Sequence, residues 1–246
     1  MVRWQAVKAM VRQAGWAASI AHGADRVLRW LGWGHVHHYV FLAQPVAEPA
    51  AAHAASRHFD CRELAAGDAA LRQLPLADAV LEYRFGQQAV AVGAFDGKRL
   101  AAVVWYTVGP YEEDEVRAHY IPLPAGRTAW DFGVYVAPAH RLGRAFASVW
   151  AAAEASMHAR GVTWTLSRVN RVNAASVAAH RRLGARAIGW ATFLRLGMLQ
   201  IAWSNRWPWL HMGLRPAARP VYRLSAPLRT EAAGPAAAPG PGAVSP

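Results

Sequence analysis

Two side chains capable of proton transfer, Asp131 and His180, stand in the second half of the chain. Asp131 lies inside an apolar run that predicts a strand from Thr128 to Val136. Tyr135 follows four positions later, so strict alternation places it on the same face as Asp131. His180 falls within a helix expected between Asn173 and Gly184. A carboxylate accepts a proton and an imidazole donates one near neutral pH, so this group predicts acid–base chemistry.

Each of these residues also has a plainer interpretation. Asp131 can be an edge carboxylate paired with an arginine, and His180 can be an outward-facing residue next to Arg181 and Arg182. The acidic run Glu112–Glu115 leaves a similar choice between attracting a cationic substrate and forming a solvated surface. The residues alone leave these alternatives open.

The turn that follows the strand has the features of an anion-binding site. Gly143 lets the backbone approach a ligand, and the first-turn amides of the helix expected from Leu142 to Arg160 carry a partial positive charge. Arg141 and Arg144 add fixed positive charge, which suits a pyrophosphate. The alternative is an ordinary strand-to-helix turn with two solvated arginines.

This turn and the later helix together resemble the acyl-CoA loop and the late helix of the GNAT superfamily. The loop of that family is written Gln/Arg-x-x-Gly-x-Gly/Ala, and the run here is His140-Arg141-Leu142-Gly143-Arg144-Ala145. The late helix of the family opens with Asn, places a Tyr seven residues on, and closes with Gly and an apolar residue. Asn173 and Gly184-Ala185 match, while His180 stands at the Tyr position. The resemblance covers roughly Asp60 to Leu196.

The resemblance implies an α+β (mixed α/β) fold with a central mixed β-sheet flanked by helices. It also implies an N-acyltransferase, in the simplest case an N-acetyltransferase, that uses acetyl-CoA or another acyl-CoA. The backbone of Val134 and Val136 would bind the pantetheine arm, and Asn173 would position the cofactor or the helix. The pyrophosphate would rest on the amides of Arg141, Leu142, Gly143, Arg144 and Ala145.

The same resemblance implies direct attack of a substrate amine on the thioester. In this scheme Asp131 is the candidate base, His180 is the candidate acid, and Tyr135 completes the catalytic group beside Asp131. An alternative of a different class is a catalytically inactive GNAT-like scaffold at a membrane surface or on a partner protein, because the family's Tyr is replaced and the loop is imperfect. The acceptor would be an amine-bearing molecule, and the sequence does not indicate which one.

The elements that must position these residues follow from periodicity and turn signals. The clearest is a β-hairpin, with apolar runs Ala89–Phe95 and Arg99–Val108 around Asp96-Gly97. We divide the chain into an N-terminal amphipathic helix with a connecting strand (1–55), an acyltransferase domain (56–198), a Trp/Arg-rich extension (199–223) and a disordered Pro/Ala/Gly tail (224–246). The amphipathic helix is expected from Trp4 to Leu31, with Gly15 and Gly23 as candidate breaks.

Composition narrows the classes of partner. The formal net charge of +12 suits nucleic acid, anionic lipid or an anionic cofactor. No nucleic-acid-binding motif is present, so we expect no nucleic acid partner. The single cysteine, Cys61, excludes an internal disulfide. His35, His37 and His38 lack a carboxylate or cysteine pattern, so we expect no metal.

The two ends of the chain bear on where the protein is located in the cell, and they allow more than one interpretation. No apolar run reaches the length of a membrane span and no signal peptide is recognisable, so we expect a cytoplasmic protein. The basic amphipathic helix and the Trp/Arg-rich segment are typical of docking at the inner face of an anionic membrane. The alternatives are that these segments cover the outer side of the sheet or pair two subunits as a homodimer.

Overall fold

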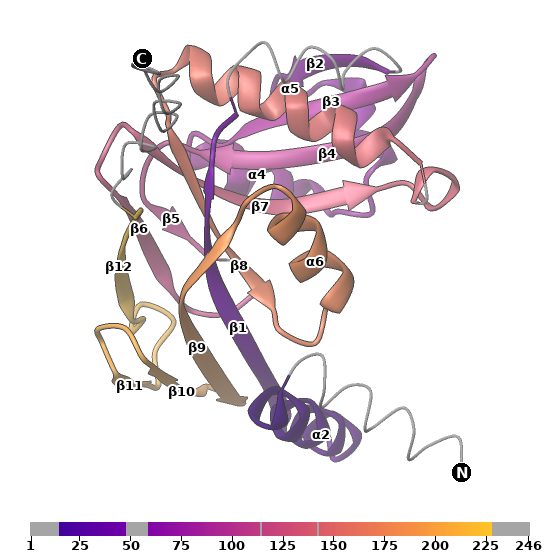
Figure 1. The fold of residues 1–246 in the computed structure, drawn as a ribbon. Helices are drawn as coiled ribbons and strands as arrows, with labels where there is room; N and C mark the ends of the chain where they lie inside the picture. The colour runs from indigo at the N-terminus through magenta and orange to yellow at the C-terminus, as the bar shows by residue number, and fades with distance from the viewer. Residues whose placement is uncertain (1–14, 48–58, 114, 142, 228–246) are drawn as a thin grey trace, which may run out of the picture.

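A nine-stranded mixed β-sheet forms the frame of the molecule, with strand order β11-β10-β9-β1-β8-β7-β4-β3-β2 (Figure 1). The computed structural model describes residues 15–47, 59–113, 115–141 and 143–227. The strands of this sheet are β1 Gly34–Pro45, β2 Asp60–Leu64, β3 Val90–Asp96, β4 Arg99–Thr107, β7 Thr128–Val136, β8 Trp164–Asn170, β9 Arg186–Leu196, β10 Leu199–Ser204 and β11 Leu210–Gly213. The mixed sheet predicted from the sequence is confirmed.

Most neighbours in the sheet are antiparallel, and the parallel pair is β7 with β8. The hairpin predicted around Asp96-Gly97 is confirmed as β3 and β4. β1 lies in the middle of the sheet and pairs with β8 on one side and β9 on the other. β10 pairs with β9, so strands from residues 1–55, 56–198 and 199–223 share one sheet.

Helices cover parts of both faces. Their bounds are α2 Trp16–Trp30, α4 Asp78–Gly86, α5 Ala145–Ala159 and α6 Ala174–Arg182, with 3-10 turns η2 Ala69–Gln73 and η3 Pro138–His140. α5 lies across β3 and β4, and Val149 and Trp150 are buried against that face (Figure 1). α6 covers β1 on the same side, where Val177 packs on Val40 and Leu42. None of the described helices is long and apolar enough to span a membrane.

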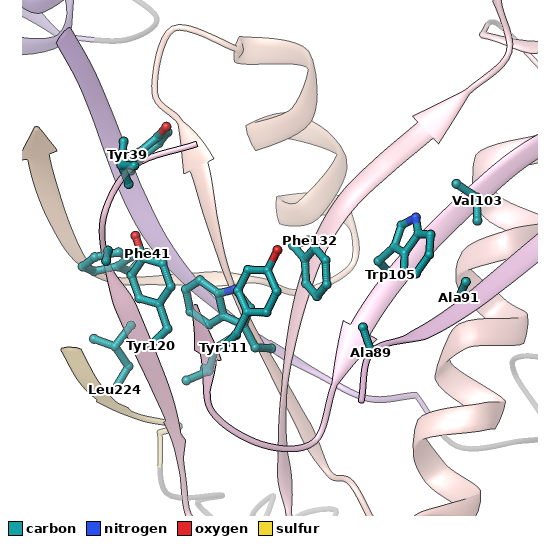
Figure 2. Close-up of a cluster of buried hydrophobic side chains, with 14 of the residues drawn as sticks. Tyr39, Phe41, Ala89, Ala91, Val103, Trp105, Tyr111, Tyr120, Phe132 and Leu224 are labelled. Carbon is teal, nitrogen blue, oxygen red and sulfur yellow. The ribbon is translucent and has the colours of Figure 1, made fainter. Parts of the chain in front are cut away.

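The opposite face is covered by η2, α4 and a second, three-stranded sheet. That sheet has the order β12-β6-β5, with β5 Tyr111–Glu112, β6 His119–Leu123 and β12 Val221–Ser225. Figure 2 shows aromatic side chains of both sheets in one core, including Phe41, Trp105, Tyr111, Tyr120 and Phe132. The ring centroids of Tyr111 and Phe132 lie 4.0 Å apart. The aromatic contacts therefore fix the small sheet to the large one.

The predicted N-terminal helix is present in its described part. α2 begins after Gly15, whose φ of 85° suits glycine, and continues through Gly23. Residues 4–14 of the predicted helix lie outside the described residues, as does most of the predicted disordered tail. The Trp/Arg-rich segment forms β10 and β11 and leads into β12, which pairs with β6.

Candidate active site

β7 and β8 part in the middle of the large sheet. Their pairing runs from Thr128 opposite Trp164 to Asp131 opposite Ser167 and goes no further, although β7 continues to Val136 and β8 to Asn170. A cleft of about 610 Å³ opens where the strands separate. Residues from both faces of the sheet line it, including Arg84 of α4 and His180 of α6. The cleft therefore connects the two sides of the molecule.

A β-bulge at Gly133 marks the point of separation. Phe132 pairs with Trp105 of β4 and Tyr135 pairs with Val103, so β7 has one residue more than β4 between these pairs. Gly133 has a φ of 60°, and a Cβ placed there would lie 2.6 Å from Nη1 of Arg84. Glycine is thus required both by the backbone and by the close approach of the buried guanidinium.

Because of the bulge, the prediction that Asp131 and Tyr135 lie on one face of the strand is wrong. Strict alternation placed the two side chains on one face, but the extra residue reverses the alternation after Gly133. Tyr135 packs against the core that contains Phe132, whereas Asp131 points to the opposite face, where Thr165 contacts it. Tyr135 is therefore separated from Asp131 by the sheet.

Asp131 lies at the vertex of the cleft and is almost completely buried. Its side chain is 2% exposed, and Thr165 Oγ1 donates a hydrogen bond of 2.7 Å to its Oδ2. Burial raises the pKa of Asp131 to about 7, and hydrogen bonds from Thr165 and Ser167 oppose this rise. A carboxyl group with such a pKa exchanges a proton readily near neutral pH.

His180 does not follow the plainer of the two interpretations offered by the sequence. It is buried rather than outward-facing, with Nδ1 3.2 Å from Oε1 of Gln44 and its ring edge-on to Trp150. Burial lowers the pKa of His180 to about 4, so the ring is neutral at physiological pH. The structure brings His180 to the cleft, but this pKa does not favour the proton-donor role.

Asn173 lies at the start of α6 and also lines the cleft. Its Oδ1 accepts a hydrogen bond of 3.1 Å from the backbone amide of Ser176, which is an N-cap interaction. The helix that sequence placed between Asn173 and Gly184 is confirmed, and Gly184 follows it with a φ of 84°. Of the two roles considered for Asn173, positioning the helix is the one that this contact performs.

The other mouth of the cleft is built around a partly buried arginine, Arg168. Its Nε lies 2.6 Å from Oε2 of Glu113, and its Nη2 lies 2.9 Å from Oε2 of Glu115. The guanidinium also stacks 4.3 Å from the ring centroid of Tyr39, whose hydroxyl donates to Glu115. Glu113 is therefore buried and paired, which differs from the solvated acidic surface considered for this loop.

The predicted anion-binding turn lies at the end of β7, beyond the residues that line the cleft. η3 leads to Arg141, the amide of Gly143 donates to the carbonyl of His140, and α5 starts at Ala145. No side chain caps α5 and no acidic residue stands in its first turn, so its first amides remain suited to an anion. Arg141 and Arg144 are exposed there, and Leu142 lies outside the described residues.

The structure brings together part of the predicted site. Asp131, Val134, Asn173 and His180 line one cleft. Tyr135, Val136 and the described residues of the turn, Arg141, Gly143, Arg144 and Ala145, are not part of its lining. Sequence reasoning missed the site residues Gly133, Arg84, Ser167 and Arg168. Gly133 carried a signal, because an isolated glycine in an apolar strand is typical of a bulge.

No family model matches the chain, and no curated protein matches it. Solved structures do match. Several of them are GNAT proteins. A putative acetyltransferase of the GNAT family from Novosphingobium aromaticivorans is 21% identical over 64% of this chain and 63% of its own, with a TM-score of 0.41.

Two further structures are similar at the same level. A tandem GNAT protein from the clavulanic acid biosynthesis pathway is 15% identical over 71% of this chain and 58% of its own, with a TM-score of 0.45. A functionally unknown conserved protein from Staphylococcus epidermidis is 11% identical over 69% of this chain and 64% of its own, also with a TM-score of 0.45. The aligned part of this chain spans about three-fifths of the length of these proteins.

Among the described residues, no group of three His, Cys, Asp or Glu side chains is arranged to hold a metal ion. The three histidines considered from the sequence have other contacts. His38 Nδ1 lies 2.7 Å from the hydroxyl of Thr192, and His37 Nδ1 lies 3.0 Å from the hydroxyl of Tyr39. His35 is exposed and stands 4.0 Å from Asp25.

Proposed function

We propose that this protein is an acyl-CoA-dependent N-acyltransferase, in the simplest case an N-acetyltransferase. The observation that carries this proposal is the separation of β7 from β8 at the buried carboxyl group of Asp131. The separation gives two substrates access to one point from opposite sides of the sheet. It also leaves a strand edge that can bind an extended chain.

The donor side fits an acyl-CoA in three respects. Beyond Asp131, the edge of β7 that carries Val134 and Val136 has none of the described strands beside it, so its backbone can hydrogen-bond the amides of a pantetheine arm. The uncapped first turn of α5 follows directly along the chain and suits a pyrophosphate. Arg141 and Arg144 add positive charge at that turn. When bound, an acyl-CoA supplies the thioester that an amine attacks.

The acceptor side is the mouth formed by α4, the loop after β5 and β8. Its charged lining consists of Arg84, Glu113, Glu115 and Arg168. Glu115 is about half exposed and stands where it can attract an amine in its ammonium form. The acceptor class proposed is therefore an amine-bearing molecule that enters past this mouth.

Asp131 is the proposed proton acceptor of the transfer step. The bound ammonium first loses one proton to water. In the transfer step the neutral amine then forms a carbon–nitrogen bond while the carbon–sulfur bond breaks, its nitrogen loses a second proton, and the sulfur gains one. Above its pKa of about 7, Asp131 can take the proton of the amine directly or through one water molecule. Thr165 and Ser167 would hold the carboxylate in place while it does so.

Thermal unfolding with and without acetyl-CoA tests the donor site, with Gly143→Glu as the disrupting variant. A Cβ at Gly143 would lie 3.4 Å from the His140 carbonyl, which is ordinary contact, so the variant should fold. Ligand at about a hundred times its Kd should stabilise the parent by about 2.7 kcal/mol, and the variant should lose this gain. Gly23→Glu is the matched control, because a Cβ at Gly23 meets nothing within 4 Å.

An acceptor screen completes the test by following release of the CoA thiol with a panel of amines. Thiol release that depends on an amine supports the proposal. Stabilisation by acetyl-CoA without turnover on any amine would favour the inactive scaffold instead. If Gly143→Glu is stabilised as strongly as the parent, the anion site at α5 is wrong.

A further inference from the structure

One end of the large sheet carries a continuous apolar face that crosses four strands. The registers place two cross-strand rows side by side on β1, β9, β10 and β11. One row is Val36, Leu194, Ile201 and Met212, and the other is His38, Thr192, Trp203 and Leu210. In the second row His38 and Thr192 hydrogen-bond each other, which leaves the outer part of both rows apolar.

α2 covers only the β1 side of this face. Val27 and Leu28 of the helix stand opposite Leu194 and Trp203 of the sheet, and an open apolar trough of about 1000 Å³ lies between them. Figure 1 shows α2 at the same end of the molecule as β10 and β11. The helix is therefore one wall of the trough, and the sheet is the other.

Large apolar side chains stand exposed on both sides of the trough. On α2, Trp16 is 72% exposed and Trp30 is 84% exposed, and their spacing along the helix places them on one stripe with Ile20 and Val27. On the hairpin of β10 and β11, the side chains more than 60% exposed are Trp207, Trp209, Leu210 and Met212, with Leu214 just after it. Contiguous apolar surface of this kind marks an interaction site rather than ordinary exposure.

Arginines surround this surface almost without acidic neighbours. No Asp or Glu occurs between Glu154 and Glu231, so every ionised side chain of β9, β10, β11 and their turns is an arginine. On α2, the carboxylate of Asp25 is bound by Arg29 Nε at 2.8 Å and by the amide of Val36 at 2.9 Å. Arg26 of α2 and Arg215, which follows β11, are exposed.

We propose that this face, made by α2 and the β10–β11 hairpin, binds the surface of an anionic lipid bilayer. Tryptophan rings are amphipathic and prefer the boundary between acyl chains and headgroups, and arginines bind the phosphates of the headgroups. Acyl chains can adapt to an open trough, whereas a rigid protein partner needs a matching ridge to fill it. The excess of arginine selects a negatively charged lipid surface.

Flotation of the full chain with vesicles tests this proposal. One set contains phosphatidylglycerol and phosphatidylcholine in equal parts, and the other contains phosphatidylcholine alone. The chain should float with the mixed vesicles and much less with phosphatidylcholine, and flotation with the mixed vesicles should weaken as salt is raised. Brominated lipids should quench its tryptophan fluorescence in the mixed vesicles.

Two double variants separate the apolar and the charged contributions. Trp207→Ser with Trp209→Ser should lower partitioning roughly tenfold or more, because two large apolar groups are removed. Arg26→Glu with Arg215→Glu should lower partitioning by about ten- to a hundredfold. Arg72→Glu with Arg99→Glu changes the net charge equally near the opposite edge of the sheet and should leave flotation unchanged.

Three results would overturn the proposal. They are absence of flotation, equal flotation on both vesicle types, and insensitivity to both double variants. A dimer in sedimentation velocity that the tryptophan variant dissociates, without flotation of the parent, would identify a second copy of the chain as the occupant. The substituted side chains are exposed, and far-UV circular dichroism checks that each variant is folded.

Discussion

The cleft between β7 and β8 and the trough beneath α2 open on the same sheet but differ in chemistry. The cleft buries charged groups, with Asp131 at its vertex and Glu113 paired to Arg168 at one mouth. The trough is lined mainly by apolar side chains and exposes tryptophans. The cleft arises because two strands diverge, and the trough arises because a helix covers only part of a sheet face.

This difference separates two kinds of evidence for function. Burying ionisable groups costs stability, so a fold that retains them in a cleft is typical of a site where charge is used. Exposed apolar area instead indicates a surface that another phase or molecule covers. The cleft therefore predicts a catalytic site, and the trough predicts a surface that docks on a membrane or another molecule. The following substitutions test the cleft, beginning with Asp131.

Asp131→Asn should have the largest effect. We expect kcat to fall roughly 100- to 1000-fold with acetyl-CoA and an accepted amine, because the proposed proton acceptor is removed. For the parent, kcat/KM should rise with pH through about 7, where Asp131 ionises. The variant should lack this rise, whereas the same rise in both proteins would remove Asp131 from the mechanism.

The stability of Asp131→Asn provides the control for unfolding. The folded pKa of Asp131 is raised, so between about pH 4 and about pH 7 the folded state keeps a proton that the unfolded state has lost. The parent's free energy of unfolding should therefore fall across this window by a few kcal/mol. The variant should lack this contribution, because an asparagine does not ionise. It should therefore not be less stable than the parent on this account at neutral pH, and lost turnover cannot be attributed to unfolding.

Glu113→Gln and Glu115→Gln compare two partners of one arginine. Glu113 is buried, so its loss should lower the free energy of unfolding by about 3 kcal/mol, because Arg168 then keeps only the half-exposed Glu115 as a carboxylate partner. The side chain of Glu115 is 48% exposed, so its loss should cost about 1 kcal/mol or less. Urea unfolding measures both, and equal losses would show that burial does not distinguish the two pairs.

Gly133→Ala should lower the free energy of unfolding by about 2 kcal/mol. Part of the loss comes from its positive φ, and part from displacing the guanidinium of Arg84. Gly97→Ala isolates the first part, because Gly97 also has a positive φ but its Cβ would meet nothing within 4 Å. We expect about 1 kcal/mol for Gly97→Ala. Calorimetry of the two variants would contradict this account if their losses were equal.

Local signals predicted much of the frame. The β3–β4 hairpin follows from two apolar runs around a turn, and α6 follows from an Asn cap and a closing glycine. Asp131 was placed correctly on a strand that leads to a helix. These features depend on residues close together in the chain, which is why periodicity and caps indicate them.

The features that sequence reasoning missed depend on contacts between distant segments. The central place of β1 is decided by its pairing with β8 and β9, and the burial of Glu113 is decided by Arg168. His180 is buried because α6 packs toward Trp150, which its immediate neighbours do not indicate. The bulge at Gly133 is the exception, since one glycine in the strand signals it.

The central position of β1 also has a consequence for the order of folding. Tyr39 pairs with Asn170 on one side and with Ala191 on the other. β1 therefore cannot pair with either neighbour until β8 and β9 have been synthesised. Such long sequence separations raise contact order and slow the closing of a sheet. As the chain leaves the ribosome, β1 emerges without its partner strands. The β3–β4 hairpin can form well before β8 and β9 are synthesised and pair with β1.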